Sequence, residues 1–280
     1  MMRTALIAAA FTAHAIAETA APTAEQLRGI VRKAIDGLKN EDDRRGQFLF
    51  KARNERKELD ASGKVLNLHS HSWERIEIDG FPFGRTLERD GKPLTGEERK
   101  TEDAAIQKRL AELKVPKATE ASVGALSTRG GGKSQHDDWY MEFPDALDFK
   151  LVRQETINNR LAWHLEAWPK PQYQAKNMRA RVFGKMKANF WIDKASSELV
   201  KADAEMFDTV SVGFGVLGKI EKGTRFRLQR RQIADGEWLI ESQYMRFGAR
   251  ILLFKTLRNE STTEWSEFRR RPKMLPAPKP

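Results

Sequence analysis

The 280-residue sequence contains no cysteine. Disulfide bonds are therefore excluded, and the core alone must hold the fold together. The absence also excludes a cysteine nucleophile and the acylated cysteine that anchors a bacterial lipoprotein behind its cleavage site. No apolar run reaches the length that a membrane-spanning helix needs.

Recognisable catalytic motifs are also missing: the sequence has no H-E-x-x-H, no G-x-S-x-G and no Walker lysine motif. His69 and His71 are two residues apart, so on a strand they point to one side and are candidates for a metal. No third and fourth ligand accompanies them, and the run His136-Asp137-Asp138 lies in a glycine-rich loop. We therefore expect no enzyme, no metal and no cofactor, although His69 and His71 ordered beside carboxylates in a cleft would favour catalysis.

The N-terminus has the pattern of a secretory signal peptide. Arg3 precedes a short apolar stretch over residues 4–13, and Ala15-Ile16-Ala17 fits the small-x-small cleavage rule. We expect cleavage after Ala17 and a soluble product in a bacterial periplasm or outside the cell. The alternative, a buried N-terminal helix, is disfavoured because residues 15–22 break any helical stripe.

Positive charge is in excess, with a formal net charge of +11. The stretch "KNMRARVFGKMK" (176–187) has five cations and no acid, and the next clustered cations are Arg225, Arg227, Arg230 and Arg231. Basic faces attract phosphate-bearing partners. For an exported protein we expect an anionic membrane surface rather than nucleic acid, and a plain solvated face is the alternative.

Periodicity predicts two helices. Residues 23–39 repeat apolar side chains at intervals of three and four, and Thr23 with Gln26 is spaced as a capping box. A second helix is expected from Thr95, with Glu98 completing its capping box. Between 114 and 137 the periodicity is lost, which predicts a flexible loop.

The rest of the chain reads as strands. Two extended runs flank a turn signal at residues 60–63, and in the second run His69, His71 and Trp73 share one face. From Asp145 onward, strands joined by short turns predict an antiparallel sheet.

Gly213, Gly215 and Gly218 have the G-x-G-x-x-G spacing of a dinucleotide-binding turn. Such a turn needs a helix directly after it, because the helix N-terminus receives the pyrophosphate. Here Gly223 ends any helix within two turns, and residues 225–228 alternate as in a strand. We therefore expect a bend between antiparallel strands rather than an NAD site.

Four phrases resemble the periplasmic outer-membrane lipoprotein-sorting (LolA-like) superfamily. They are "GRTLERDGKPLTGEE" (84–98), "FPDALDFKLVRQETINNRLAWHLEAWPKPQY" (143–173), "NFWIDKASSELVKADAEMFD" (189–208) and "LLFKTLRNESTTEWSEF" (252–268). The resemblance implies an α+β, mainly β fold: a curved antiparallel sheet forming an incomplete β-barrel covered by helices. We expect one such domain over residues 18–270, after a signal peptide at 1–17. A flexible insert at about 114–138 and a disordered tail at 271–280 complete the expected organisation.

The resemblance further implies a soluble carrier whose concave apolar face holds a lipid or the acyl chain of a lipoprotein. By strand parity, the residues assigned to that inner face are Leu161, Trp163, Leu165, Phe226, Leu228, Trp238 and Ile240. The long insert at 84–138 departs from the short carriers. The alternative is an interaction or regulatory module of the cell envelope with the same fold, which bulky side chains filling the cavity would favour.

Overall fold

The structure, a computed structural model, describes seven segments of the chain. They are residues 22–39, 41–114, 138–176, 179–212, 218–233, 236–251 and 255–272. Several expectations lie outside the described residues: the signal peptide, the glycine-rich loop with His136 and Asp137, Gly213 and Gly215, and the tail beyond residue 272.

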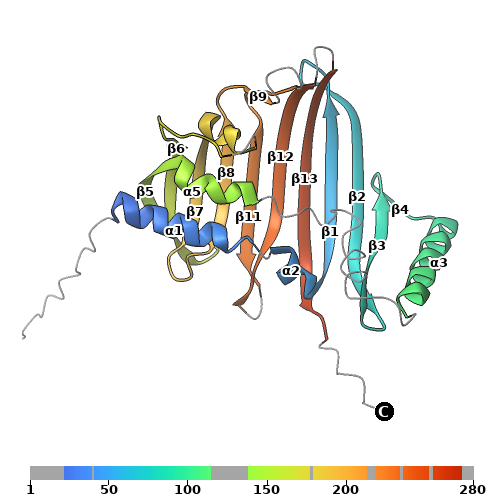
Figure 1. Cartoon of the computed structure of the whole chain (residues 1–280). Helices are drawn as coiled ribbons and strands as arrows, with labels where there is room; N and C mark the ends of the chain where they lie inside the picture. Colours follow the sequence, from blue (N-terminus) through green and yellow to red (C-terminus); the bar gives the residue numbers. More distant parts are fainter. Residues whose placement is uncertain are drawn as a thin grey trace, which may run out of the picture.

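Within these segments, thirteen strands form one antiparallel sheet (Figure 1). The first seven are β1 (Phe48–Leu59), β2 (Val65–Ile78), β3 (Phe81–Arg89), β4 (Lys92–Pro93), β5 (Leu147–Ile157), β6 (Arg160–Pro169) and β7 (Met186–Asp193). The others are β8 (Leu199–Met206), β9 (Val210–Val212), β10 (Gly218–Ile220), β11 (Arg225–Gln232), β12 (Trp238–Ile251) and β13 (Lys255–Arg270).

The strand order in space is β4-β3-β2-β1-β13-β12-β11-β8-β7-β6-β5, with β10 pairing to β12 and β9. Among the described strands, β4 and β5 at the two ends each have one neighbour, so the sheet does not close. The expected mainly β fold with an open, curved antiparallel sheet is therefore confirmed (Figure 1). The last strand, β13, lies between β1 and β12, near the middle of the sheet.

Helices cover part of the sheet. They are α1 (Ala24–Asp36), α2 (Glu41–Gly46), α3 (Gly96–Leu113) and α5 (Phe143–Ala146), with 3-10 helices η1 (Asp138–Glu142) and η2 (Arg179–Lys185). Figure 1 shows α1 and α5 lying across one face, in front of β5, β6, β7, β8 and β11, and α3 beyond the edge made by β3 and β4. We call the face of the sheet that α1 covers the inner face. No helix among the described residues is long and apolar enough to cross a membrane.

Both predicted capping boxes are confirmed. The Thr23 hydroxyl accepts a 3.3 Å hydrogen bond from the Gln26 backbone N–H, and the Gln26 side chain accepts one from the Thr23 N–H at 2.7 Å. Thr95 and Glu98 repeat this exchange at the start of α3. These bonds satisfy backbone N–H groups that the first turn leaves without partners.

The two helices bury their apolar sides in different clusters. The apolar stripe of α1 joins the main cluster through Leu27, Val31, Ala34 and Ile35. The insert helix α3 instead packs on β2 and β3, where its buried side chains meet Phe83 in a smaller separate cluster. The expected helix in the insert is confirmed, and it extends the sheet edge rather than covering the main cluster.

The turns also agree with their sequence signals. At the β1–β2 turn, Asp60 accepts hydrogen bonds from the backbone N–H groups of Ser62 (2.8 Å) and Lys64 (3.0 Å), and Gly63 has φ +89°. In the glycine-rich region, Gly218 of β10 lies opposite Val212 of the antiparallel strand β9. Strand β10 then leads through a turn to β11 rather than to a helix, which supports the expected bend between antiparallel strands.

Asp193 is the last residue of β7, at the lower end of the sheet. Its carboxylate accepts bonds from Arg160 at 2.7 and 2.9 Å and from the Ser196 N–H at 2.7 Å, and its side chain is 1% exposed. Burial by itself raises the pKa of Asp193, but the bonds from Arg160 and Ser196 outweigh burial and hold it at about 2, below the ordinary 3.8.

The depressed pKa of Asp193 predicts a defined acid sensitivity. The stabilisation, about 2 kcal/mol, is fully present above pH 4 and is lost as the pH falls through about 2. Urea unfolding of the wild type and of Asp193→Asn should show a gap in unfolding free energy that is largest above pH 4 and shrinks below it. The exposed Asp103→Asn on α3 serves as the control, with a gap near zero throughout. A gap for Asp193→Asn that stays constant down to pH 2 would contradict this assignment.

Candidate functional site

The inner face of β5 to β8 and β11 is apolar. Its cluster is centred on phenylalanines: the Phe143 ring lies edge-on to Phe190 and Phe183, with centroids 4.9 and 5.2 Å apart. Strand pairing sets Leu165 of β6 beside Phe190 of β7, and Ala202 of β8 lies on the far side of Phe190. Helix α1 closes this surface from the opposite side.

Five of the seven residues assigned by parity lie in this cluster. Leu165 and Leu228 are buried in it, and Trp163, Phe226 and Ile240 pack against it half-buried. They come from three strands, β6, β11 and β12, that are distant in sequence. The structure therefore brings these five side chains together under α1.

The other two residues lie apart from the cluster. Leu161, at the start of β6, is 46% exposed. Trp238 is buried, but the Arg160 guanidinium covers its ring at 5.6 Å and it is not part of the cluster under α1. The parity of both residues places them on the expected side of their strands. The position along the strand, which parity does not specify, separates them from the other five.

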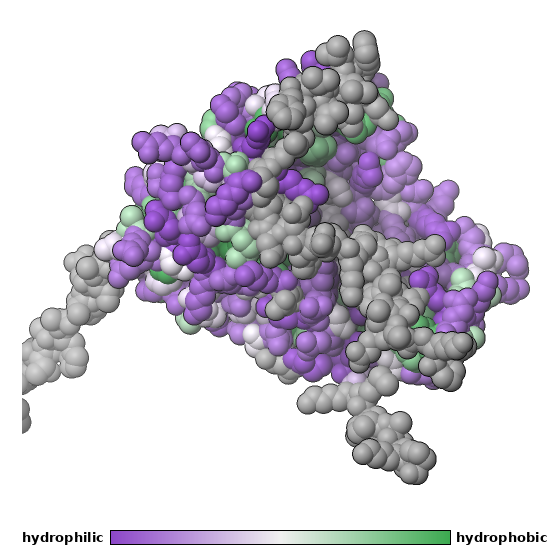
Figure 2. All heavy atoms as spheres, in the orientation of Figure 1, coloured by the Kyte–Doolittle hydropathy of each residue, from purple (hydrophilic) through white to green (hydrophobic). Residues whose placement is uncertain are grey.

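The interior of the cluster is filled. Leu165 and Ile192 are 0% exposed, and the Phe143 ring contacts those of Phe149, Phe183 and Phe190, while Phe149 also contacts Phe190. Close packing of this kind leaves few voids larger than a water molecule. Over α1 and its neighbours the outward surface is mostly hydrophilic, with small apolar areas between (Figure 2). An apolar ligand can therefore bind at this site only by replacing contacts that α1 now makes.

A buried ion network ties α2 to the sheet beside this cluster. Arg230 of β11 is 0% exposed and donates to Glu198 (2.7 Å), to Glu41 of α2 (3.2 Å) and to the Trp238 carbonyl (2.9 Å). The other Glu41 carboxylate oxygen accepts from the Ile240 N–H at 2.8 Å. Arg230 was expected to add to a basic surface, and its burial shows that this expectation was wrong.

Two of the neighbouring arginines are paired with acids. Arg225 forms bidentate bonds to Asp203 at 2.8 and 2.6 Å, and Arg231 lies 3.1 Å from Glu241. Arg227 is exposed and stacks over the Tyr244 ring at 4.2 Å. Because these partners lie on the neighbouring strands β8 and β12, the pairing is not visible from the run of arginines alone.

On the opposite, outer face, sequence reasoning missed a buried histidine. His164 is 7% exposed, stacks on Trp191 with ring centroids 4.5 Å apart, and shares a 2.8 Å hydrogen bond with Asn189. Trp191 also donates a hydrogen bond to Glu155, which lowers the pKa of that carboxyl, and Lys201 lies over the indole ring at 4.4 Å. The signal was available as the alternation in β6, which puts His164 on the side opposite Trp163.

The two histidines of β2, His69 and His71, contact different partners. His69 lies 3.7 Å from Asp90, whereas His71 stacks on Trp73 and sits 3.3 Å from the Thr86 hydroxyl. Burial, and then Arg89, lowers the pKa of His71. Among the residues that the structure describes, no group of three histidines and carboxylates could hold a metal ion.

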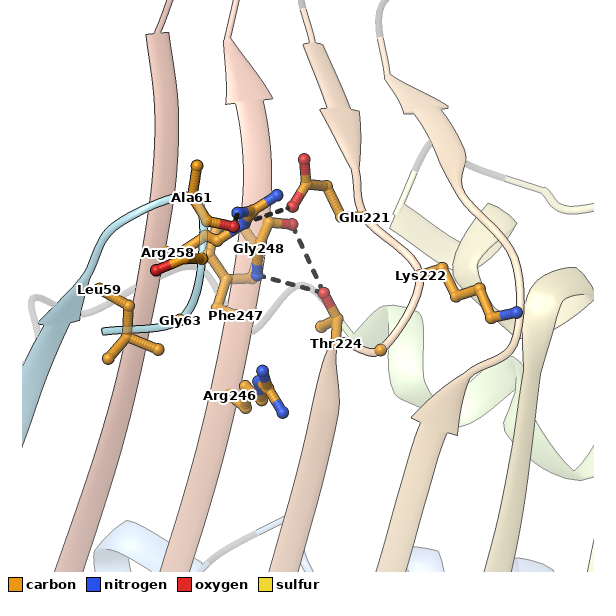
Figure 3. Close-up of a pocket in the computed structure, with 12 residues that line it drawn as sticks. Leu59, Ala61, Gly63, Glu221, Lys222, Thr224, Arg246, Phe247, Gly248 and Arg258 are labelled. Atoms are coloured by element: carbon orange, nitrogen blue, oxygen red, sulfur yellow. Dashed lines mark hydrogen bonds and ion pairs between the residues drawn. The ribbon is translucent and has the colours of Figure 1, made fainter. Parts of the chain in front are cut away.

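A pocket of about 280 Å³ opens at the upper end of the sheet. It lies between the β1–β2 turn, the turn at Lys222–Gly223 and the facing parts of β12 and β13 (Figure 3). Figure 3 shows Arg258 spanning it: the guanidinium donates to the Ala61 carbonyl and, at 2.9 Å, to Glu221. Arg246 also lines the pocket, so its lining contains more positive than negative charge.

No protein-family model and no curated protein matches the chain. Several solved structures resemble it. A LolA superfamily protein from Nitrosomonas europaea is 13% identical, with 91% of this chain and 96% of that chain covered and a TM-score of 0.28. An outer membrane lipoprotein-sorting protein domain from Vibrio parahaemolyticus is 12% identical, covering 87% and 94%, with a TM-score of 0.30.

A third is MucB of Pseudomonas aeruginosa in its complex with MucA. It is 11% identical, with 83% of this chain and 94% of that chain covered and a TM-score of 0.24. At such identities and TM-scores the likenesses carry no assignment of function, and the fold class rests on the open antiparallel sheet itself. The solved structures that this chain is similar to thus include members of the LolA superfamily.

Proposed function

We propose that this chain is an exported binding protein that takes an apolar ligand, an acyl chain of a lipid or lipoprotein, between α1 and the sheet. The observation that carries the proposal is the apolar face to which Trp163, Leu165, Phe226, Leu228 and Ile240 contribute, covered by the amphipathic helix α1 together with α5, η1 and η2. An acyl chain that displaced α1 would contact the same apolar side chains that α1 contacts now.

The energetics permit such an exchange. Burying an acyl chain contributes at most about 0.8 kcal/mol per CH₂ group, so a chain of ordinary length offsets the loss of several α1 contacts. An ion pair between Arg32 of α1 and Asp145 of α5 ties the two helices together, and both side chains are about half exposed. Exposed pairs of this kind contribute about 1 kcal/mol or less, so the helix is held mainly by apolar contacts that a ligand can replace.

The uptake of a fluorescent fatty acid tests the proposal. We expect Trp163→Asp to abolish uptake, because a carboxylate on the covered face cannot be solvated once an acyl chain is in place. Leu161→Asp, the same substitution two residues away on the same strand, should bind as the wild type does, because Leu161 lies outside the cluster. Circular dichroism checks that both variants fold.

If Trp163→Asp does not fold, Trp163→Ala replaces it, and it should weaken uptake severalfold. If both Trp163 variants took up fatty acid as well as the wild type does, the acyl chain would not bind under α1. Failure of the wild type itself to take up fatty acid would contradict the carrier proposal.

A second candidate is an interaction module of the cell envelope that carries no ligand. The filled phenylalanine cluster around Phe143 and Phe190 favours it, because a packed interior leaves no preformed cavity. Native mass spectrometry of the exported protein separates the two. A co-purifying lipid mass supports the carrier, and a bare protein that also fails to take up fatty acid supports the interaction module.

A further inference from the structure

Exposed apolar side chains are concentrated at one end of the sheet. This upper end is where β7, β11 and β13 begin and β1, β6, β8 and β12 end. Most of the large hydrophobic residues that are exposed lie there: Val65, Leu66, Leu68, Trp168, Phe207 and Met245. Most exposed apolar residues on a soluble protein are scattered singly, so their concentration at one end points to a docking surface.

The chain places Phe207 between two basic turns. Its backbone N–H donates at 3.0 Å to the carbonyl of Lys185 at the end of η2. Two residues further on, the Thr209 hydroxyl accepts a 3.3 Å bond from the N–H of Lys222, in the turn that follows β10. Phe207 is 40% exposed in this position. The backbone that carries this exposed ring is therefore linked to η2 on one side and, through Thr209, to the Lys222 turn on the other.

Exposed cations lie on the segments that flank this phenylalanine, in η2, β7, β10 and the turn after β10. Arg181, Lys187, Lys219 and Lys222 are exposed and form no ion pair within the described part of the chain. The acids beside these turns are already engaged. They pair as Asp208 with Lys185, Glu205 with Arg225, Glu221 with Arg258, and Glu260 with Arg246. Glu58 and Asp60, at the β1–β2 turn, form no ion pair among the described residues and accept hydrogen bonds from Asn67, Ser62 and Lys64. The charge left over around Phe207 is therefore positive.

The same end continues across the pocket to the β1–β2 turn. The pocket is lined by Ala61 to Gly63 on one side and by Lys222 to Thr224 on the other, so the two turns are neighbours. Beyond it, exposed Lys64 precedes the exposed Val65 and Leu66. The arrangement repeats that around Phe207: apolar side chains at a turn with a cation beside them.

We propose that this end of the molecule, from η2 through Phe207 and Lys222 to Leu66, is a docking surface for an anionic lipid bilayer. Aromatic and aliphatic side chains that enter the headgroup region, flanked by Lys and Arg, are the features that hold proteins at such a surface. Charge complementarity selects the occupant, because the unpaired cations match lipid phosphates. The proposal is independent of acyl-chain binding under α1.

An extended peptide adding to the free edge of β2 is the other occupant to consider. Strand β3 pairs with β2 only from His71 onward, so the first residues of β2 lack that neighbour. Leu66, however, is the extra residue of a β-bulge, since Glu58 pairs with Asn67 and Leu59 with Val65. Bulges at sheet edges interrupt the ladder that an added strand needs, which favours the bilayer.

Vesicle co-sedimentation tests the proposal. The exported chain should sediment with vesicles of phosphatidylglycerol and phosphatidylcholine and not with phosphatidylcholine alone, and raising the salt to about 0.5 M should release it. Each cation near an anionic surface contributes about 1 kcal/mol, so the double variant Lys219→Glu and Lys222→Glu should bind at least about tenfold more weakly. Phe207→Ser should weaken binding severalfold.

The matched control reverses the same number of charges elsewhere. Arg99 and Lys108 are exposed on α3, and Arg99→Glu with Lys108→Glu changes net charge equally. This control should retain vesicle binding, and Leu161→Ser should match the wild type where Phe207→Ser does not. Equal losses in both charge-reversal variants would overturn the proposal by reducing the effect to net charge.

Absence of wild-type binding to phosphatidylglycerol vesicles would also overturn the proposal and leave the exposed edge of β2 to a protein partner. Fatty-acid uptake by the same variants separates the two proposals. It should be unchanged in Lys219→Glu with Lys222→Glu, because neither residue belongs to the cluster under α1.

Discussion

Replacing Arg230 with alanine should destabilise the protein by about 3–5 kcal/mol. Arg230 is fully buried and is shared by the carboxylates of Glu41 and Glu198, so its removal leaves Glu198 without a cation and leaves Glu41 with only its 3.4 Å pair to Arg44. A buried charge without a partner costs far more than an exposed one. Urea denaturation followed by circular dichroism measures the change, which should appear as a lower midpoint with an unchanged slope.

Two further variants separate the ion network from a general effect of losing an arginine. Arg231→Ala removes the next residue, whose ion pair with Glu241 is half exposed, and should change stability by about 0.5 kcal/mol or less. Combining Arg230→Met with Glu41→Gln and Glu198→Gln removes all three charges and should recover much of the loss. If Arg230→Ala lowered the unfolding free energy by less than about 1 kcal/mol, the carboxylates of Glu41 and Glu198 would be solvated by water in the variant.

Phe190→Ala should cost about 3–5 kcal/mol. Phe190 is 4% exposed at the centre of the cluster, between Phe143 and Phe149 and beside Leu165. Removing its ring deletes buried surface and leaves a cavity that the neighbouring strands cannot close. The unfolding free energy from urea titration is again the measurement.

Phe207→Ala provides the matched control, because the same substitution at a side chain 40% exposed should cost about 0.5 kcal/mol or less. If Phe190→Ala proved equally mild, the cluster under α1 would be loosely packed. That result would favour the carrier over the interaction module. Both outcomes therefore bear on function as well as on stability.

Local elements could be predicted from the sequence where local chemistry determines them. The capping boxes at Thr23 and Thr95, the Asp60–Gly63 turn and the antiparallel surroundings of Gly218 all follow from side chains within a few residues of one another. Strand parity likewise identified five side chains that meet under α1. In each of these cases the determining partner is near in sequence, or the side chain is placed by the strict alternation of residues between the two faces of a strand.

The features that escaped prediction depend on partners far away in the chain. Arg230 looks like part of a basic run, and its burial becomes apparent only when Glu41, 189 residues away, is placed beside it. Leu161 has the parity of Trp163, but the end of the sheet leaves it exposed. The His164–Trp191 stack depends on the register of β6 against β7, which no single strand specifies.

The position of β13 affects the order in which the molecule can be completed. Strand β1 is among the first parts of the chain to be synthesised, yet one of its two neighbours in the sheet is β13, the last strand. Pairing Phe48 with Arg270 brings together residues that are 222 positions apart (270 − 48), and contacts of such sequence separation form slowly. Until residues 255–270 are available, β1 and β12 both present open edges. The two halves of the sheet are therefore joined only after the C-terminal strand has emerged.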